Sequence, residues 1–207
     1  MAVSNLEEYN VIGSAVRRDE IPAPYNKLPL LGRGATTLAF ARDEQTALLF
    51  TRDRIKAEWL SHGLGMAHNQ QVVHPVHWHH IPGMEHHDLI MIEMPRLYDL
   101  NSANRTMVIR ETRQFTKILG NRRLWPRDKD FRETLTAVIA EYEQHYPQSH
   151  ILPLLEWVAN YDPRDFFLDI GPRQYKQTAS GDIVLLDPVV AADILTLLQS
   201  KGKSKRW

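Results

Sequence analysis

The sequence predicts a single α+β domain in which a sheet-rich first half is followed by a helix-rich second half. Short runs of β-branched and aromatic residues before residue 100 predict strands, whereas apolar residues recur at helical spacing after it. With 207 residues the chain can bury a substantial core, and its lack of cysteine excludes disulfides and thiolate metal sites. This order of elements is typical of an α+β fold.

In the first half, Asp53 is expected to cap a helix that ends near Gly63. The segment Ile21-Pro-Ala-Pro24 contains two helix breakers, so residues 1–26 are expected to precede the fold proper. Strands are predicted over residues 30–41 (with a glycine turn), 47–51 and 88–94.

In the second half, apolar residues at helical spacing give one apolar face to each of several predicted helices. Two short apolar runs are expected to form a hairpin around the turn Ala179-Ser-Gly-Asp182. The predicted helices cover residues 104–120, 130–142, 154–161 and 189–198, and the strands cover 166–168 and 183–186.

Charge and hydropathy narrow the possible partners. The 25 basic and 25 acidic residues cancel, so neither nucleic acid nor a membrane is expected as a partner. No apolar run reaches the roughly 20 residues that span a bilayer, and the first ten residues do not resemble a signal peptide. We therefore expect a cytoplasmic protein, with residues 201–207 forming a solvated basic tail.

Two features of the first half are typical of nucleotide binding. Gly32 and Gly34 form a predicted turn between apolar runs, where backbone amides can approach phosphate oxygens without intervening Cβ atoms. Glu58 lies on the next helix, where it would face a lysine on the preceding strand.

Three polar residues of the second half extend this pattern. Asp169 follows a short strand, Gln174 comes five residues later, and Asp187 ends another buried strand beyond a turn. In phosphoryl transfer one aspartate accepts the proton of the attacking hydroxyl, while an amide and a second aspartate hold magnesium. We expect Asp169 to act as the base, Asp187 and Gln174 to bind Mg²⁺, and the two aspartates to lie together at a cleft.

These motifs resemble the protein kinase fold, and most closely the small serine/threonine kinases of T7-like bacteriophages. The segments that carry the resemblance are Phe167-Leu-Asp-Ile-Gly-Pro-Arg-Gln174, Leu185-Leu-Asp-Pro-Val189 and Leu30-Leu-Gly-Arg-Gly-Ala-Thr-Thr-Leu-Ala-Phe40. The first is similar to the catalytic loop, the second to the metal-binding segment and the third to the glycine-rich loop. The resemblance implies a minimal two-lobed fold with an antiparallel sheet lobe and a truncated helical lobe.

This resemblance also implies a division of the chain. Residues 1–26 would be an N-terminal extension, and residues 27–100 the kinase-like N-lobe. Residues 101–200 would form a reduced helical C-lobe with the catalytic-loop hairpin, followed by the tail at 201–207.

Several positions depart from the kinase pattern. Leu49 stands where a kinase has its strand lysine, Phe167-Leu168 replaces the usual His-Arg pair, and Gln174 replaces asparagine. These changes predict impaired catalysis and weak or absent binding of Mg-ATP. In an active enzyme, Arg52 or Lys56 would have to replace the missing lysine.

Two further segments are candidate binding surfaces. Seven of the ten histidines fall between His68 and His87, a grouping that suggests a metal site, an ordinary polar surface or a pH-sensitive surface. Tryptophan and arginine are enriched at protein interfaces. A protein partner is therefore expected to contact one of two patches, which contain Trp78 in one case and Arg122, Arg123, Trp125 and Arg127 in the other.

Three functions remain open at this point. The first is a pseudokinase of phage type that binds and modulates a host protein and needs no cofactor. The second is an active, atypical serine/threonine kinase that uses Mg-ATP on host proteins. The third is an unrelated α+β protein that binds metal through the cluster His68–His87.

Overall fold

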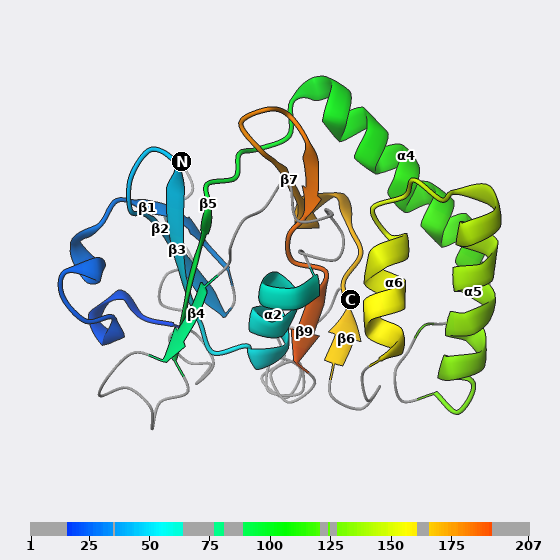
Figure 1. Cartoon of the computed structure of the whole chain (residues 1–207), viewed down its shortest axis with the longest axis horizontal. Helices are drawn as coiled ribbons and strands as arrows, with labels where there is room; N and C mark the ends of the chain where they lie inside the picture. The colour runs from blue at the N-terminus through cyan, green and yellow to red at the C-terminus, as the bar shows by residue number, and fades with distance from the viewer. Residues whose placement is uncertain are drawn as a thin grey trace, which may run out of the picture.

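The structure, a computed structural model, describes residues 16–34, 36–63, 77–80, 89–120, 124, 128–160 and 166–191. Within these residues the fold is α+β (Figure 1). An antiparallel sheet lies at one end of the molecule and helices α4, α5 and α6 at the other, with α2 and two small two-stranded sheets between them. We call these two parts the sheet half and the helical half.

The sheet has five strands in the order β1-β2-β3-β5-β4, and every neighbouring pair is antiparallel. In β2 buried and partly exposed residues alternate, as expected for a strand with two different faces. The central strand β3 is almost entirely buried because both of its faces are covered. The strands are β1 (Leu30–Arg33), β2 (Thr37–Ala41), β3 (Thr46–Thr51), β4 (His77–His80) and β5 (Ile90–Pro95).

The outer face of the sheet is covered by residues 16–28. Val16 and Ile21 are buried in one apolar cluster with Phe40 and Phe50. The expectation that residues up to 26 precede the fold proper is therefore wrong from Val16 onward. The prolines at positions 22 and 24 interrupt helices, but they do not prevent an irregular segment from burying its apolar side chains.

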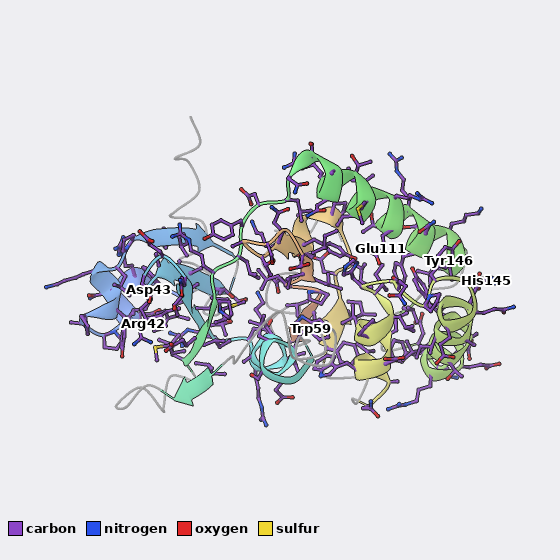
Figure 2. The ribbon with its side chains drawn as sticks, turned by 45° about the horizontal axis from the view of Figure 1, so that its top comes forward. Arg42, Asp43, Trp59, Glu111, His145 and Tyr146 are labelled. Atoms are coloured by element: carbon purple, nitrogen blue, oxygen red, sulfur yellow. The ribbon has the colours of Figure 1, made fainter. Side chains whose placement is uncertain are left out.

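Helix α2 (Arg54–Glu58) and the π-helical turn Trp59–Gly63 lie between the two halves. The helix begins where predicted, because the Asp53 carboxylate accepts a hydrogen bond from the backbone amide of Lys56. The fully buried Trp59, labelled in Figure 2, donates its indole N–H to the carbonyl of Leu185 at 3.2 Å, which connects this turn to the hairpin beyond it.

The helical half is built on three helices whose apolar faces meet in one core. The buried residues of α4 and α5 recur three or four positions apart, which is the spacing of one helix face. Helix α6 is apolar almost all round, and accordingly most of its residues are buried. The helices are α4 (Ser102–Leu119), α5 (Phe131–His145) and α6 (Leu152–Ala159).

A partly buried carboxylate connects α4 to the segment before α6. Glu111 accepts hydrogen bonds from the hydroxyl of Ser149 at 2.6 Å and from the amide of His150 at 2.7 Å, and its other oxygen lies 3.3 Å from the His150 ring. Burial alone would raise the pKa of Glu111, but the bonds and charge of His150 and the hydroxyl of Ser149 lower it overall. Figure 2 shows Glu111 inside the helical half.

One short antiparallel strand pair and one hairpin complete the described part of the chain. Strand β6 (Phe166–Leu168) pairs with β9 (Val189–Ala191), and β7 (Tyr175–Gln177) pairs with β8 (Ile183–Leu185). The helix predicted over 189–198 is thus wrong at 189–191, and positions 192–198 lie outside the described residues. A short apolar run with adjacent valines fits a buried strand as well as a helix, so periodicity could not separate the two.

The connection from β5 to α4 is hydrogen bonded to both halves. The amide of Arg96 donates to the carbonyl of Gln45 in the sheet half at 2.7 Å. Tyr98 and Gln177 exchange two backbone hydrogen bonds, of 2.8 and 2.9 Å, at the start of the helical half. The Gln177 side chain also accepts from the Asn104 side chain at 2.8 Å, which fixes the start of α4 to β7.

Candidate functional site

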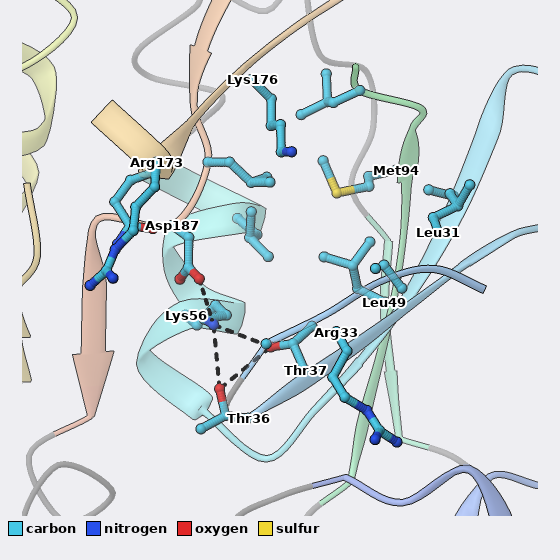
Figure 3. Close-up of a pocket in the computed structure, with 18 of the residues that line it drawn as sticks. Leu31, Arg33, Thr36, Thr37, Leu49, Lys56, Met94, Arg173, Lys176 and Asp187 are labelled. Carbon is cyan, nitrogen blue, oxygen red and sulfur yellow. Dashed lines mark hydrogen bonds and ion pairs between the residues drawn. The ribbon is translucent and has the colours of Figure 1, made fainter. Parts of the chain in front are cut away.

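A cleft of about 830 Å³ opens between the sheet half and the helical half (Figure 3). Its walls come from segments far apart in sequence: the β1–β2 turn, β3, the end of β5, α2, and two segments around Asp169 and Asp187. Such a volume is typical of small-molecule sites. Gly32, Gly34, Asp169, Gln174 and Asp187, all expected to form one site, line this cleft together.

Lys56 lies at the centre of the polar contacts in the cleft. Its side chain is 8% exposed, and its ammonium lies 2.9 Å from Asp187 Oδ2. The same ammonium donates to the hydroxyls of Thr36 at 3.3 Å and Thr37 at 3.2 Å (Figure 3). Because a buried ammonium requires partners, these contacts explain how Lys56 is accommodated. They also join α2, the glycine turn and the segment after β8.

Two other residues that the sequence suggested for this site, Arg52 and Glu58, lie outside the cleft lining. Arg52 forms an ion pair with Glu20 at 3.1 Å and is not among the described residues that line the cleft. Glu58, expected to face a strand lysine, pairs with Arg54 on the same helix at 3.1 Å and does not line the cleft either. The face of α2 that carries Lys56, and not the one that carries Glu58, is turned toward the cleft.

Asp169 lies on the cleft wall of the helical half. Its amide donates to the carbonyl of Pro188 at 2.7 Å, which holds it next to the segment of Asp187. Its carboxylate accepts from the side chains of Gln174 and Arg173, the latter at 3.4 Å. Burial raises the pKa of Asp169; Arg173 opposes this rise, and the negative charge of Asp187 adds to it. A carboxylate in this environment is a stronger base than an exposed one.

Gln174 is buried and holds two polar segments in place. Its backbone carbonyl accepts from the amides of Leu186 at 2.7 Å and Asp187 at 3.3 Å. Its side-chain nitrogen donates to Asp169, so the amide oxygen is the atom not used in that bond. The glutamine therefore connects Asp169 and Asp187 directly.

The two glycines leave open space beside the cleft, although Gly32 lies in β1 and not in the turn that was predicted for it. Apart from its chain neighbours, no described atom lies within 4 Å of the place where a side chain at Gly32 would begin. For a side chain at Gly34 the first contacts, with Thr37, are at 3.9 Å or more. Packing against the described residues does not require glycine at either position, whereas a ligand that approaches the backbone would.

The sequence indicated Lys56 only as one of two possible replacements for the missing strand lysine, although the residues around it already pointed to its importance. Ile55, Ala57, Trp59 and Leu60, which flank it in the sequence, are apolar and buried, whereas Arg54 and Glu58 form a separate charged pair. A lysine within such a helix needs an acidic partner, and the Asp187 segment supplies it. Leu49 lines the same cleft.

The predicted partner surfaces lie largely outside the described part of the chain. Trp78 is opposite Ile92 in the β4–β5 pairing, and nothing about its side chain is described. His77, His79 and His80 are also in β4, and the other histidines of the cluster are outside the described residues. Arg122, Arg123, Trp125 and Arg127 of the second patch are likewise outside the described residues.

Comparison with protein-family models, curated proteins and solved structures finds no match to this chain. None of the helices in the described ranges has the length and apolar character needed to cross a membrane. Among the same residues, no group of three or more histidine, aspartate or glutamate side chains is arranged to hold a metal ion.

Proposed function

We propose that the two halves are the lobes of a kinase-like fold and that the cleft between them binds a nucleoside triphosphate with Mg²⁺. The terminal phosphoryl group would be transferred to a hydroxyl group of a protein, which the resemblance to phage kinases suggests is a host protein. The observation that carries this proposal is the position of Lys56, whose ammonium lies between Asp187 and the hydroxyls of the glycine turn.

Lys56 removes the main objection to nucleotide binding. With Leu49 on the strand, the sequence suggested that no fixed positive charge would meet the phosphates, and hence that Mg-ATP would bind weakly or not at all. An ammonium presented from α2 supplies that charge next to Gly32 and Gly34. Charge-assisted hydrogen bonds to phosphate are among the stronger polar interactions, contributing about 1.5–3 kcal/mol each.

The oxygen atoms on the cleft wall fit magnesium. Asp187 offers a partly exposed carboxylate, and Gln174 offers an amide oxygen from the same wall. Magnesium prefers such oxygen ligands and takes further ligands from water and phosphate. Asp187 would hold the ion with Gln174 as a second ligand, and the bound ion would neutralise charge on the phosphate oxygens.

The remaining chemistry falls to Asp169 and Lys56. Lys56 would bind phosphate oxygens and stabilise the negative charge of the transferring group. Asp169, made more basic by burial, would accept the proton of the attacking hydroxyl. The hydroxyl oxygen forms a bond to the terminal phosphorus, the bond from that phosphorus to the bridging oxygen breaks, and the nucleoside diphosphate leaves.

The test measures binding and transfer separately. Calorimetry with Mg-ATP should give saturable binding to the wild type and much weaker binding to Asp187→Asn. Asp169→Asn should retain binding but lose transfer of labelled phosphate to proteins of a bacterial lysate by about 10²–10⁴-fold, the usual contribution of a general base. A wild-type protein that neither binds Mg-ATP nor transfers phosphate would refute the proposal.

A second candidate function is the one the sequence favoured, a kinase-like protein that acts by binding a host protein. A groove of about 460 Å³ on α4 favours it. Arg110, Arg113 and Lys117 line this groove and have no acidic partner among the described residues, so the surface suits an acidic protein segment.

The binding function has its own test. The double variant Arg110→Glu and Arg113→Glu should abolish salt-sensitive capture of an acidic partner. Lys129→Glu, a change at an exposed lysine away from the groove, serves as the control. Capture that survives the double variant would place the interface elsewhere.

A further inference from the structure

A second carboxylate, Asp53, lies beneath the ion pair of Lys56 and Asp187. Asp53 is fully buried, with 0% of its surface exposed. One of its oxygens accepts from the Lys56 amide at 3.0 Å, which caps α2. The other accepts from the amide of Ala191 in β9 at 3.2 Å, 138 residues further along the chain. An ordinary helix cap uses a single oxygen and needs no such distant partner.

The two bonds of Asp53 hold the two segments that carry the ion pair. Lys56 is on α2, which has only five residues and is too short to be stable without tertiary contacts. Asp187 is four residues before Ala191, in the segment that leads into β9. The position of the Lys56 ammonium relative to the Asp187 carboxylate therefore depends on the contact between α2 and β9, and Asp53 makes the hydrogen bond across that contact.

The charge of Asp53 matters as well as its shape. Burial raises the pKa of Asp53, whereas the positive charge of Lys56 and the two amide donors lower it, and Asp187 raises it further. Lys56 is thus close enough to interact with two carboxylates. An ionised Asp53 would therefore be a second negative charge near Lys56, in addition to Asp187. Serine, the usual neutral cap, could satisfy α2 but could not supply this charge or reach β9.

We propose that Asp53 is a positioning residue for the nucleotide cleft: it fixes α2 to β9 and so sets where Lys56 presents its ammonium to the phosphates. The proposal rests on the nucleotide-binding function proposed above. Asp53 does not line the cleft in this structure and acts only through Lys56 and the Asp187 segment.

The experiment compares a ligand that has phosphates with one that has none. Mg-ATP and adenosine are titrated by calorimetry into the wild type, Asp53→Ser, Asp53→Asn and the control Asn101→Ala. Asn101 caps α4 through the Asn104 amide at 2.9 Å in the same way, but it lies outside the cleft lining. Asp53→Asn keeps the size and one acceptor, so it tests the charge even if Asp53→Ser does not fold.

The expected result is a selective loss. Affinity for Mg-ATP falls by about tenfold or more in both Asp53 variants, the effect of weakening one charge-assisted bond, while affinity for adenosine changes little. Asn101→Ala alters neither affinity. Equal losses for both ligands would reduce Asp53 to a structural role, and unchanged Mg-ATP affinity in a folded Asp53 variant would overturn the proposal.

A second measurement needs no nucleotide and separates this proposal from the proposed function. The coupling between Lys56→Met and Asp187→Asn is measured by a double-mutant cycle on thermal unfolding, with and without Asp53→Asn. If Asp53 sets the geometry of the pair, the coupling shrinks in the Asp53→Asn background. An undiminished coupling refutes the positioning role. Absence of nucleotide binding in the wild type would instead refute the proposed function.

Discussion

Replacing Lys56 with methionine removes the ammonium from the cleft but keeps a side chain of similar length and volume. The wild-type ammonium is 2.9 Å from Asp187, and the two side chains are 8% and 38% exposed. Because Asp187 is partly hydrated and the volume is conserved, losing the pair with Asp187 should by itself cost about 1 kcal/mol or less, and the uncompensated charge near the buried Asp53 adds to this loss. The loss of a charge-assisted bond to phosphate should weaken the binding of Mg-ATP by about 1.5–3 kcal/mol, which raises its Kd roughly 10–150-fold.

The same variant should change metal binding in the opposite direction. In the wild type the ammonium is the counter-ion of Asp187, so a divalent ion must bind beside a positive charge. Two unit charges 4 Å apart interact by about 1 kcal/mol in water. Because Mn²⁺ carries two charges, removing the ammonium should strengthen Mn²⁺ binding by about 2 kcal/mol, or roughly 30-fold. Calorimetry with Mg-ATP and with Mn²⁺ alone measures the two effects.

The matched control is Lys176→Met. Lys176 lines the same cleft, but its ammonium is paired with Asp99 and not with Asp187. Lys176→Met should therefore reduce the affinity for Mg-ATP less than Lys56→Met does, and it should leave the affinity for Mn²⁺ unchanged. If Lys56→Met keeps wild-type affinity for Mg-ATP while remaining folded, Lys56 does not bind the phosphates and the argument from its position fails.

Three further predictions concern stability. Glu111 has a lowered pKa in the folded state, so its contribution to the free energy of unfolding should be complete above pH 4.5, the ordinary pKa of a glutamate. This contribution should disappear as the pH falls below that value. The variant Glu111→Gln should therefore show a smaller loss of stability at acid pH in pH-dependent denaturation. Trp59→Phe should lower the free energy of unfolding by about 1–3 kcal/mol, because it leaves the buried carbonyl of Leu185 without its donor. Thr51→Val should cost a similar amount, roughly 1–3 kcal/mol in urea denaturation, since the Thr51 hydroxyl donates to the Thr36 carbonyl and accepts from the Asp53 amide.

The fold was predictable where local patterns and burial coincide. The strands around Phe40 and Phe50, the cap at Asp53 and the three helices predicted between residues 104 and 161 appear close to their expected positions. The strand Val189–Ala191 was mistaken for a helix because a three-residue apolar run has no measurable period. Strand β7 was missed because only one of its residues is apolar, and its pairing depends on β8.

The candidate site was predictable in its acidic residues but not in its lysine. Asp169 and Asp187 each follow a short strand, so the sequence could bring them to one cleft. Which face of α2 meets that cleft depends on the contacts of α2 with β9, made between residues more than a hundred positions apart. Helical spacing alone could not show that Lys56 points inward and Glu58 does not.

The hydrogen bonds on either side of Leu97 limit how the cleft can open. Arg96 is held to Gln45 in the sheet half and Tyr98 to Gln177 in the helical half, so a single residue separates the two attachments. Within the connection from β5 to α4, any change of angle between the halves must be taken up by the backbone dihedrals around Leu97. A pivot of a single residue in this connection favours rotation of the two halves over sliding.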